Sequence, residues 1–184
     1  MFTTSVIAPF LQRVRLQPNE TCLESGGRKY TNAAFIQYVA PIMNELDTLT
    51  DSTVMLLMEE DVQSFAALFA AFLTGKVAVP VSTSWTEAQC ALVREAAQTS
   101  TLLTRERMQY YFRMTVEDAV CRIDNGLYQF DDAQVMARCF SFAPDGKLQE
   151  KAFTVQDIIR ITPPHPVHLF RYFTDLIAQP CSSI

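Results

Sequence analysis

The chain is poor in glycine, with only 5 in 184 residues. Loops that hold phosphate groups use glycine because their backbone N–H groups must come close to the phosphate oxygens. The sequence also lacks a Walker motif, a glycine-rich dinucleotide fingerprint and a serine nucleophile elbow. The usual sequence signatures of nucleotide binding and of serine hydrolases are therefore missing.

Cysteine is also used sparingly, and no two cysteines form a CxxC pair. An odd and widely spaced set argues against a disulfide framework and against a structural zinc site. We expect buried free thiols in a reducing cytoplasm. The five positions are Cys22, Cys90, Cys121, Cys139 and Cys181.

Histidine offers no metal site either. His165 and His168 form an HxxH pair, but Pro166 between them disfavours a turn that brings both rings to one ion. No cysteine or carboxylate lies within a few residues of the pair. We therefore expect no bound metal and a structural or surface role for both histidines.

The charge pattern and the apolar runs exclude two classes of partner. The 20 acidic and 15 basic residues are scattered and give a net charge of −5, with no basic cluster that would suit nucleic acid. The longest apolar stretch, residues 65–73, is about half of the ~20 residues needed to cross a bilayer. The first residues lack a secretory signal pattern. We expect a soluble cytoplasmic protein.

Composition predicts a folded chain, since 49% of the residues are hydrophobic and 19% are charged. We expect residues 1–184 to form a single domain. Short unbroken apolar runs predict buried strands at 53–58, 77–81 and 101–104, and helices lie between them at 62–74 and 86–98. This alternation predicts an α/β fold with a parallel sheet and right-handed crossover helices.

The amino-terminal segments form a second group. A helix is expected at residues 4–15, and Gly26-Gly27 suits the tight turn of a hairpin. Thr31 is a candidate N-cap for the next helix, which Pro41 should bend or end early.

The carboxyl-terminal segments are less regular. Asn125-Gly126 favours a β-hairpin over residues 120–130. Three proline residues favour an extended segment after residue 162. The other expected elements are helices at 105–113, 154–161 and 168–178 and a strand at 135–142.

Several of these segments together resemble a known family. Lys29-Tyr30-Thr31 precedes a helix, and residues 54–82 read VMLLMEEDVQSFAALFAAFLTGKVAVPVS, followed later by Leu102-Leu103-Thr104. This order resembles the opening of the adenylate-forming (AMP-binding) superfamily, which includes acyl-CoA synthetases, luciferases and nonribosomal peptide synthetase adenylation domains. The resemblance is clearest over residues 10–104 and implies a sheet like the first subdomain of such an enzyme.

The resemblance also implies a phosphate loop after the strand at 135–142. In the family this loop reads approximately Ser/Thr-Ser-Gly-Ser/Thr-Thr-Gly-x-Pro-Lys-Gly, whereas residues 141–150 here read SFAPDGKLQE. Only Ser141 and Gly146 match the family pattern at their positions, and Pro144 removes an N–H donor. We expect residues 141–151 to be a degenerate phosphate loop.

The charges in this segment also argue against phosphate binding. Asp145 and Glu150 place carboxylates near where phosphates would lie, and Lys147 and Lys151 could offset only part of that charge. At an effective dielectric of about 20, a carboxylate some 4 Å from a phosphate charge costs on the order of 4 kcal/mol before screening. We therefore expect no ATP binding and no cofactor.

The family's adenine and ribose contacts, its magnesium-associated glutamate and its carboxyl-terminal lysine correspond to positions beyond Ile184. The resemblance thus implies a truncated relative, a pseudoenzyme with no catalytic residues of its own.

Two further groups of polar residues have structural alternatives. Glu59-Glu60-Asp61 is an acidic run that suits the capping of a helix, although paired acids can also exchange protons. Ser82, Ser84 and Trp85 follow the second strand at its carboxyl end, where open α/β sheets bind ligands. Together with His165 and His168 they form a possible ligand rim, unless Trp85 simply packs over the loop.

Three functions are compatible with these observations. The first is a non-catalytic binding, scaffold or regulatory subunit of an acyl or peptide biosynthetic pathway, as a homodimer or in complex with a biosynthetic enzyme or carrier protein. The second is half of a split ATP- and magnesium-dependent acyl or aminoacyl ligase that another chain completes. The third is an unrelated small-ligand-binding α/β protein.

Overall fold

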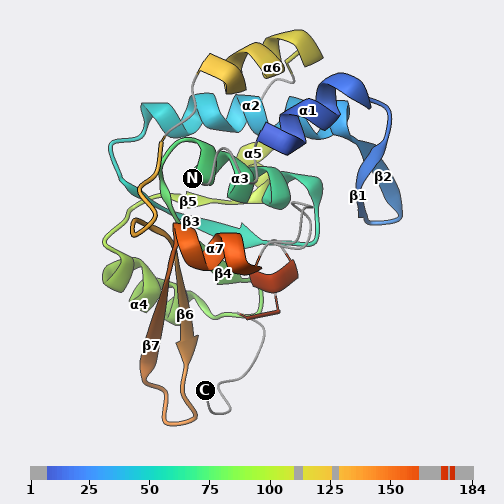
Figure 1. Cartoon of the computed structure of the whole chain (residues 1–184). Coiled ribbons are helices and arrows are strands. Elements are labelled where there is room, and N and C mark those ends of the chain that lie inside the picture. The colour runs from blue at the N-terminus through green and yellow to red at the C-terminus, as the bar shows by residue number, and fades with distance from the viewer. Residues whose placement is uncertain (1–7, 110–113, 126–128, 162–170, 174, 177–184) are drawn as a thin grey trace.

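The computed structural model describes residues 8–109, 114–125, 129–161, 171–173 and 175–176 (Figure 1). The helices are α1 Ala8–Leu16, α2 Asn32–Thr48, α3 Val62–Leu73, α4 Glu87–Ala97, α5 Arg105–Met108, α6 Val116–Asn125 and α7 Val155–Ile161. The strands are β1 Thr21–Ser25, β2 Arg28–Thr31, β3 Thr53–Met58, β4 Val77–Ser82, β5 Leu102–Leu103, β6 Val135–Phe142 and β7 Leu148–Thr154.

The main sheet has the strand order β5-β3-β4-β6-β7. Strand β3 pairs in parallel with β4 and β5, and β4 pairs in parallel with β6. These pairings confirm the α/β prediction. The last strand differs, because β7 pairs antiparallel with β6. A short turn joins β6 to β7, and a parallel return would need a crossover of a dozen or more residues.

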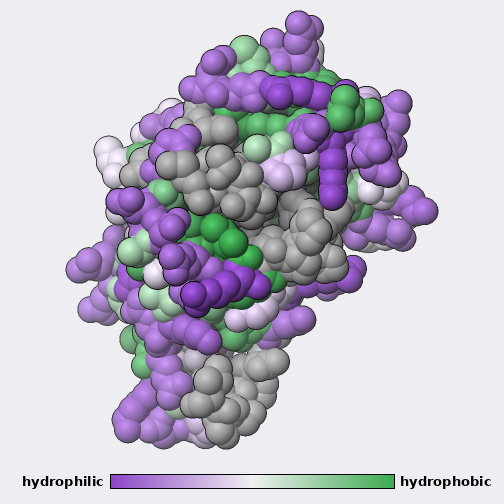
Figure 2. Space-filling model, viewed as in Figure 1, coloured by the Kyte–Doolittle hydropathy of each residue, from purple (hydrophilic) through white to green (hydrophobic). Residues whose placement is uncertain are grey.

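The two faces of this sheet carry separate cores. Val54 and Leu56 of β3 point to the face that α2 and α3 cover, whereas Met55 points to the face that α4 covers (Figure 1). Helix α3 is buried nearly all round, which explains its apolar sequence. On the face shown in Figure 2, hydrophilic residues cover most of the described surface and hydrophobic ones form small separate patches.

The hairpin and the helix cap predicted for the amino-terminal part are confirmed. Strands β1 and β2 form an antiparallel hairpin in which Gly26 and Gly27 have φ values of 58° and 72°, a region that favours glycine. The Thr31 hydroxyl accepts from Ala34 N at 3.2 Å and caps α2. Helix α2 continues through Pro41 to Thr48, so the expectation that proline ends it early is wrong.

The hairpin predicted over residues 120–130 is also wrong. Residues Val116–Asn125 form helix α6, which buries Ala119 and Ile123. The apolar spacing of three and four residues in this segment outweighs the turn preference of Asn-Gly. Arg122 holds the helix against α2 through Asn44 (2.6 Å) and an ion pair with Asp47.

The described residues of the carboxyl-terminal part agree with the other predictions only in part. Helix α5 ends at Met108, and residues 110–113 of the predicted helix 105–113 lie outside the described residues. Thr154 caps α7 by accepting from Asp157 N at 3.3 Å. Residues 171–173 and 175–176 are helical, within the predicted helix 168–178. The extended proline segment, His165, His168 and Cys181 lie outside the described residues.

At the amino ends of β3 and β5, one carboxylate links the segments that lead into the two strands. Asp51 Oδ2 accepts from Thr99 Oγ1 (3.1 Å), Ser100 N (3.0 Å), Ser100 Oγ (3.0 Å) and Thr101 Oγ1 (3.2 Å). These bonds, led by the Ser100 N–H, lower the pKa of Asp51. Lys76 Nζ donates to the carbonyls of Leu49 and Asp51, both at 2.8 Å. The connections α2–β3, α3–β4 and α4–β5 are thereby held together by hydrogen bonds.

The described cysteines are free thiols, as expected. Burial raises the pKa of Cys22 and of Cys139 to about 12, so both are protonated and unreactive at neutral pH. Cys121 is exposed, contrary to the expectation that all thiols are buried. None of the helices in the described part of the chain is both long and apolar enough to cross a membrane.

Candidate functional site

Three loops extend from the carboxyl ends of the parallel strands. They follow β3 (residues 59–61), β4 (residues 83–86) and β6 (residues 143–147). Because β3, β4 and β6 are parallel, their carboxyl ends face the same way. Ligands of open α/β sheets bind at such an edge. This edge is therefore the candidate site, and each loop contributes different chemistry.

The β6–β7 turn is where the resemblance placed a phosphate loop. Ala143 N donates to Lys147 O at 2.9 Å, and Gly146 N donates to Ala143 O at 2.8 Å. Lys147 N donates to Asp145 Oδ1 at 3.1 Å. Pro144 has no N–H to offer. The turn therefore uses these three N–H groups internally instead of presenting them as an anion nest.

The charged side chains of the turn neutralise each other. Lys147 Nζ lies 2.8 Å from Asp145 Oδ2, with the two side chains 80% and 53% exposed. The lysine side chain and its N–H together lower the pKa of Asp145. The turn thus has a carboxylate at its tip and its only lysine is already paired.

The loop is shorter than the sequence predicted. Ser141 belongs to β6, and Glu150 and Lys151 belong to β7, so the segment 141–151 is mostly a hairpin. Lys151 Nζ lies 5.3 Å from the centre of the Phe153 ring. Ser141 and Lys151 therefore do not belong to the turn itself.

Arg138 anchors this hairpin to the helix behind it. Its guanidinium donates to Glu150 at 2.6 and 3.0 Å and to the carbonyls of Ala96 (3.1 Å) and Ala97 (3.3 Å). The Glu150 side chain raises the pKa of Arg138, and Arg138 lowers the pKa of Glu150. The charge of Glu150 is thus offset within the sheet, whereas the prediction placed it near the phosphates.

The β4–α4 loop holds the predicted rim residues Ser82, Ser84 and Trp85. Ser82 Oγ lies 2.8 Å from Ser84 Oγ, and Trp85 N donates to Ser82 O at 3.2 Å. The Trp85 ring meets Phe142 edge-on, with 5.4 Å between centroids and an angle of 88°. Trp85 therefore packs between this loop and the end of β6, as the structural alternative expected.

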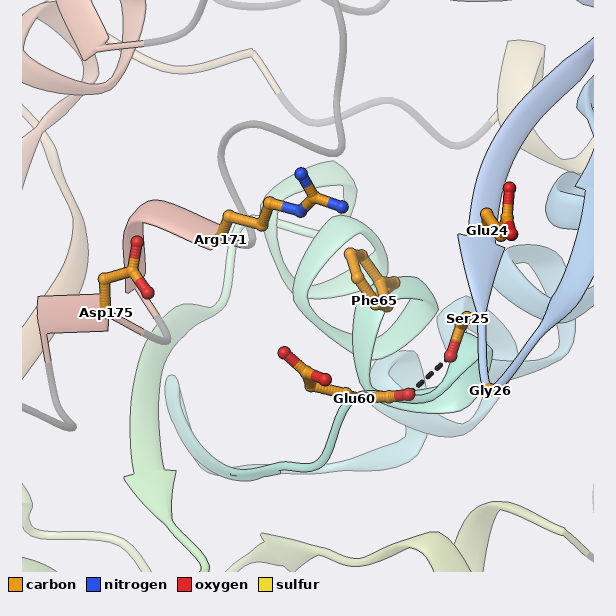
Figure 3. Close-up of a pocket in the computed structure, with 7 residues that line it drawn as sticks. All are labelled: Glu24, Ser25, Gly26, Glu60, Phe65, Arg171 and Asp175. Carbon is orange, nitrogen blue, oxygen red and sulfur yellow. Dashed lines mark hydrogen bonds between the residues drawn. The ribbon is translucent and has the colours of Figure 1, made fainter.

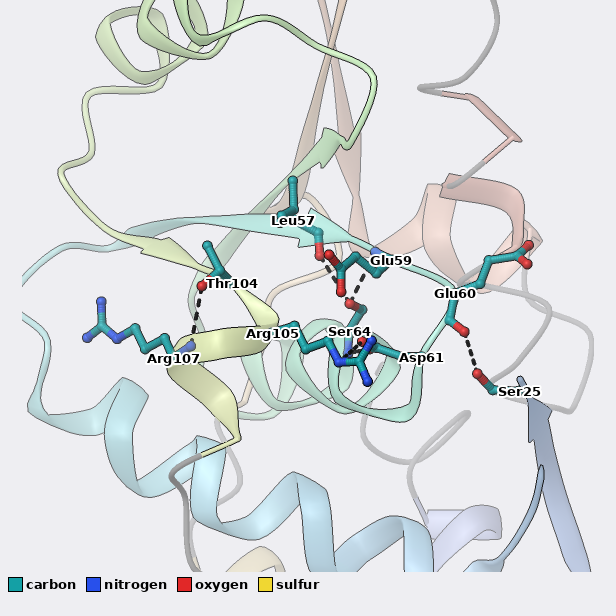
Figure 4. Close-up of polar contacts among 9 residues, drawn as sticks. All are labelled: Ser25, Leu57, Glu59, Glu60, Asp61, Ser64, Thr104, Arg105 and Arg107. Atoms are coloured by element: carbon teal, nitrogen blue, oxygen red, sulfur yellow. Dashed lines mark hydrogen bonds and ion pairs between the residues drawn. The ribbon is translucent and has the colours of Figure 1, made fainter. Parts of the chain in front are cut away.

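The β3–α3 loop contains the acidic run, shown in Figure 4. Asp61 Oδ1 accepts from Ser64 N at 2.7 Å and caps α3, as predicted. Ser64 Oγ donates to Leu57 O at 3.1 Å and accepts from Glu59 N at 3.2 Å. Arg105 Nε lies 3.6 Å from Asp61 Oδ2. The loop is held mainly by its own polar groups.

Glu59 is the unusual acid of this loop. Its Oε2 and Asp61 Oδ2 are buried and have no hydrogen-bond partner among the described residues. Burial raises the pKa of Glu59, and the neighbouring Asp61 carboxyl raises it further. A protonated Glu59 can share its proton with Asp61, as paired acids do.

A small pocket lies beside the β1–β2 turn, shown in Figure 3. The Ser25 hydroxyl donates to the Glu60 carbonyl and joins the turn to the β3–α3 loop. The pocket holds about 120 Å³ and is lined by Glu24, Ser25, Gly26, Glu60, Phe65, Arg171 and Asp175. These residues come from three distant segments, so no sequence signal brought them together.

The comparisons with known proteins concern the fold. No protein-family model and no curated protein sequence matches the chain. Several solved structures do match the chain in fold. VinN has a TM-score of 0.64 at 14% identity, covering 84% of this chain and 44% of its own. The Vibrio cholerae adenylation domain AlmE, in complex with glycyl-adenosine-5'-phosphate, has a TM-score of 0.65 at 13% identity. The match covers 84% of this chain and 36% of AlmE.

A third similar structure is the N-terminal subdomain of Klebsiella oxytoca NpsA in complex with 3-hydroxybenzoyl-AMSN. Its TM-score is 0.61 at 17% identity, covering 89% of this chain and 44% of NpsA. The chain thus spans less than half the length of these three neighbours. Its α/β fold matches the N-terminal subdomain of the adenylate-forming enzymes.

Proposed function

We propose that the chain is a non-catalytic, adenylation-domain-like protein that serves as a binding, scaffold or regulatory subunit in an acyl or peptide biosynthetic pathway. The observation that carries the proposal is the closed β6–β7 turn. Its N–H groups at residues 143, 146 and 147 are bonded within the turn, and Lys147 is paired with Asp145.

Binding a triphosphate at this turn would require several of these bonds to break. Each net hydrogen bond is worth about 0.5–1.5 kcal/mol, and the Asp145 carboxylate would remain beside the phosphates. That repulsion is on the order of 4 kcal/mol at 4 Å before screening. The remaining cation, Lys147, cannot offset both the phosphates and its present partner.

A partner-binding role suits the face of the sheet that α4 covers. Leu57, Trp85, Phe142 and Leu148 pack against the core of this face but stay only partly buried. Half-buried aromatic and aliphatic side chains of this kind are common in interfaces. We propose a homodimer or a complex with a biosynthetic enzyme or carrier protein.

Calorimetric titration of the purified chain with Mg-ATP tests the loss of nucleotide binding. We expect no saturable heat up to about 1 mM ATP, which corresponds to less than ~4 kcal/mol of binding free energy. Lys147→Ala should behave like the parent chain. Micromolar affinity of the parent chain for Mg-ATP that is lost in Lys147→Ala would contradict the proposal.

Light scattering after size-exclusion chromatography tests the partner-binding part. We expect a mass equal to a dimer or to a stoichiometric complex with a co-purifying biosynthetic protein. A monomer that activates a carboxylate by itself would contradict this part of the proposal.

A second candidate function is supported by NpsA. In that structure a separate N-terminal subdomain is in complex with 3-hydroxybenzoyl-AMSN. By analogy, this chain would be half of a split acyl or aminoacyl ligase that uses ATP and magnesium. Pyrophosphate exchange that appears only when a second chain is added would support the split ligase over the scaffold.

A further inference from the structure

A pocket beneath the middle of α2 differs in character from the others. It holds about 100 Å³ between α2, the first turn of α3 and the end of α5. Its lining residues are Gln37, Tyr38, Pro41, Ile42, Gln63, Met108 and Gln109. None of the loops at the carboxyl edge contributes to it.

The described residues that line this pocket carry no formal charge. The pocket near β1–β2 has Arg171 and three carboxylates, and a groove between α1 and α6 has Arg15, Glu117 and Asp124. A charged ligand that enters uncharged walls loses hydration without gaining a counter-charge. The described lining of this pocket therefore favours neutral ligands over charged ones.

Three glutamine amides give the pocket its polar groups. Each amide offers two N–H donors and a carbonyl acceptor. Gln37 Nε2 donates to Met114 O at 2.7 Å, which orients that side chain and leaves its Oε1 able to accept. The side chains of Gln63 and Gln109 make no hydrogen bond to any other described residue.

Because of Pro41, the backbone carbonyl of Gln37 is a further hydrogen-bond acceptor in this part of α2. In an α-helix the carbonyl of Gln37 receives its bond from the N–H four residues later. That position is Pro41, inside α2, and proline has no N–H. The Gln37 carbonyl, directed toward Pro41, therefore lacks its helical donor.

We propose that this pocket binds a neutral, planar group that donates and accepts hydrogen bonds, namely a carboxamide or a cyclic imide. The amides match such a group, and Tyr38, Ile42 and Met108 supply apolar walls. The volume of about 100 Å³ is well above the ~10–15 Å³ that a cavity needs to hold one water, and it suits a single small ring. The group comes either from a free small molecule or from a partner's glutamine or asparagine side chain.

NMR titration of the isotope-labelled chain tests this site with three probes. Nicotinamide offers a ring-bound carboxamide, N-acetylglutamine amide offers the side-chain form, and nicotinate is the anionic counterpart of nicotinamide. We expect at least one carboxamide to bind with a dissociation constant on the order of 1 mM, and nicotinate about 10-fold more weakly. The preferred carboxamide then identifies the source of the ligand.

Gln63→Met keeps the length of the side chain but removes the amide, and should weaken binding about 5-fold or more. Gln156→Met, an exposed position on α7, is the matched control and should bind like the parent chain. Absence of saturable binding up to about 20 mM, equal binding of nicotinate, or an unchanged Gln63→Met would overturn the proposal. ATP titration does not probe this pocket, so it can fail or hold independently of the proposed function.

Discussion

At the scale of single residues, Glu59 shows how burial and a neighbouring acid act together. Burial and Asp61 both raise its pKa above the ordinary value of 4.5. The folded state therefore binds this proton more tightly than the unfolded state does. Stability falls as the pH rises from about 4.5 through the raised pKa, and the loss persists above it.

Glu59→Gln should be more stable than the parent chain at neutral pH, because the amide keeps the shape without the buried charge. The gain should shrink toward zero below pH ~4.5, where Glu59 is protonated in both states. Thermal unfolding at a series of pH values between about 4 and 8 measures this. Glu60→Gln, an exposed change in the same loop, should follow the parent chain. A less stable Glu59→Gln at pH 7 would show that the charged carboxylate is favourable.

At the scale of elements, the β6–β7 hairpin depends on Arg138. Its bonds to Glu150, Ala96 and Ala97 join two strands to the end of α4. Arg138→Met should destabilise the chain by about 1–3 kcal/mol, because the helix carbonyls and Glu150 lose a charged donor. Glu150 is 38% exposed, so solvent screening favours the lower end of this range.

Urea unfolding of Arg138→Met gives the magnitude, and two variants serve as comparisons. Glu150→Gln keeps the bonds to α4 and should lose less stability. Arg94→Met, an exposed position on α4, should lose little or none. Equal midpoints for Arg138→Met and Arg94→Met would mean that Arg138 does not anchor the hairpin.

The same elements show how far sequence patterns reach. A continuous apolar run predicted β3 with the correct bounds, and the strand expected at residues 135–142 coincides with β6. The exposed residues 149–152 of β7 have no apolar alternation, so that strand was not predicted. In α6, a local turn preference at Asn125-Gly126 was given more weight than helical spacing. The position of Ser82 at the end of β4 could be predicted because a strand end sets its place, but the pockets depend on tertiary packing.

At the scale of the whole molecule, Asp51 makes stability sensitive to acid. Its pKa is lowered from 3.8 by the Ser100, Thr99 and Thr101 donors. A lowered folded-state pKa contributes stability above the unfolded value of 3.8, and this contribution is lost as the pH falls through the lowered pKa.

Asp51→Asn should therefore be less stable than the parent chain at pH 7, because the amide is a weaker acceptor for four donors. The two proteins should converge at the lowest pH at which both remain folded. Thermal melts between about pH 2 and pH 7 test this, with Asp131→Asn, at an exposed residue before β6, as a control. A constant difference at every pH would indicate a structural defect unrelated to ionisation.

Strand β7 has a further consequence for growth of the sheet. It is the last strand in the described order, and Glu150 and Lys151 both stand exposed at its centre. In an antiparallel pair of two β7 strands centred on either residue, like charges would lie directly opposite each other. The edge therefore discourages open-ended polymerisation through added strands.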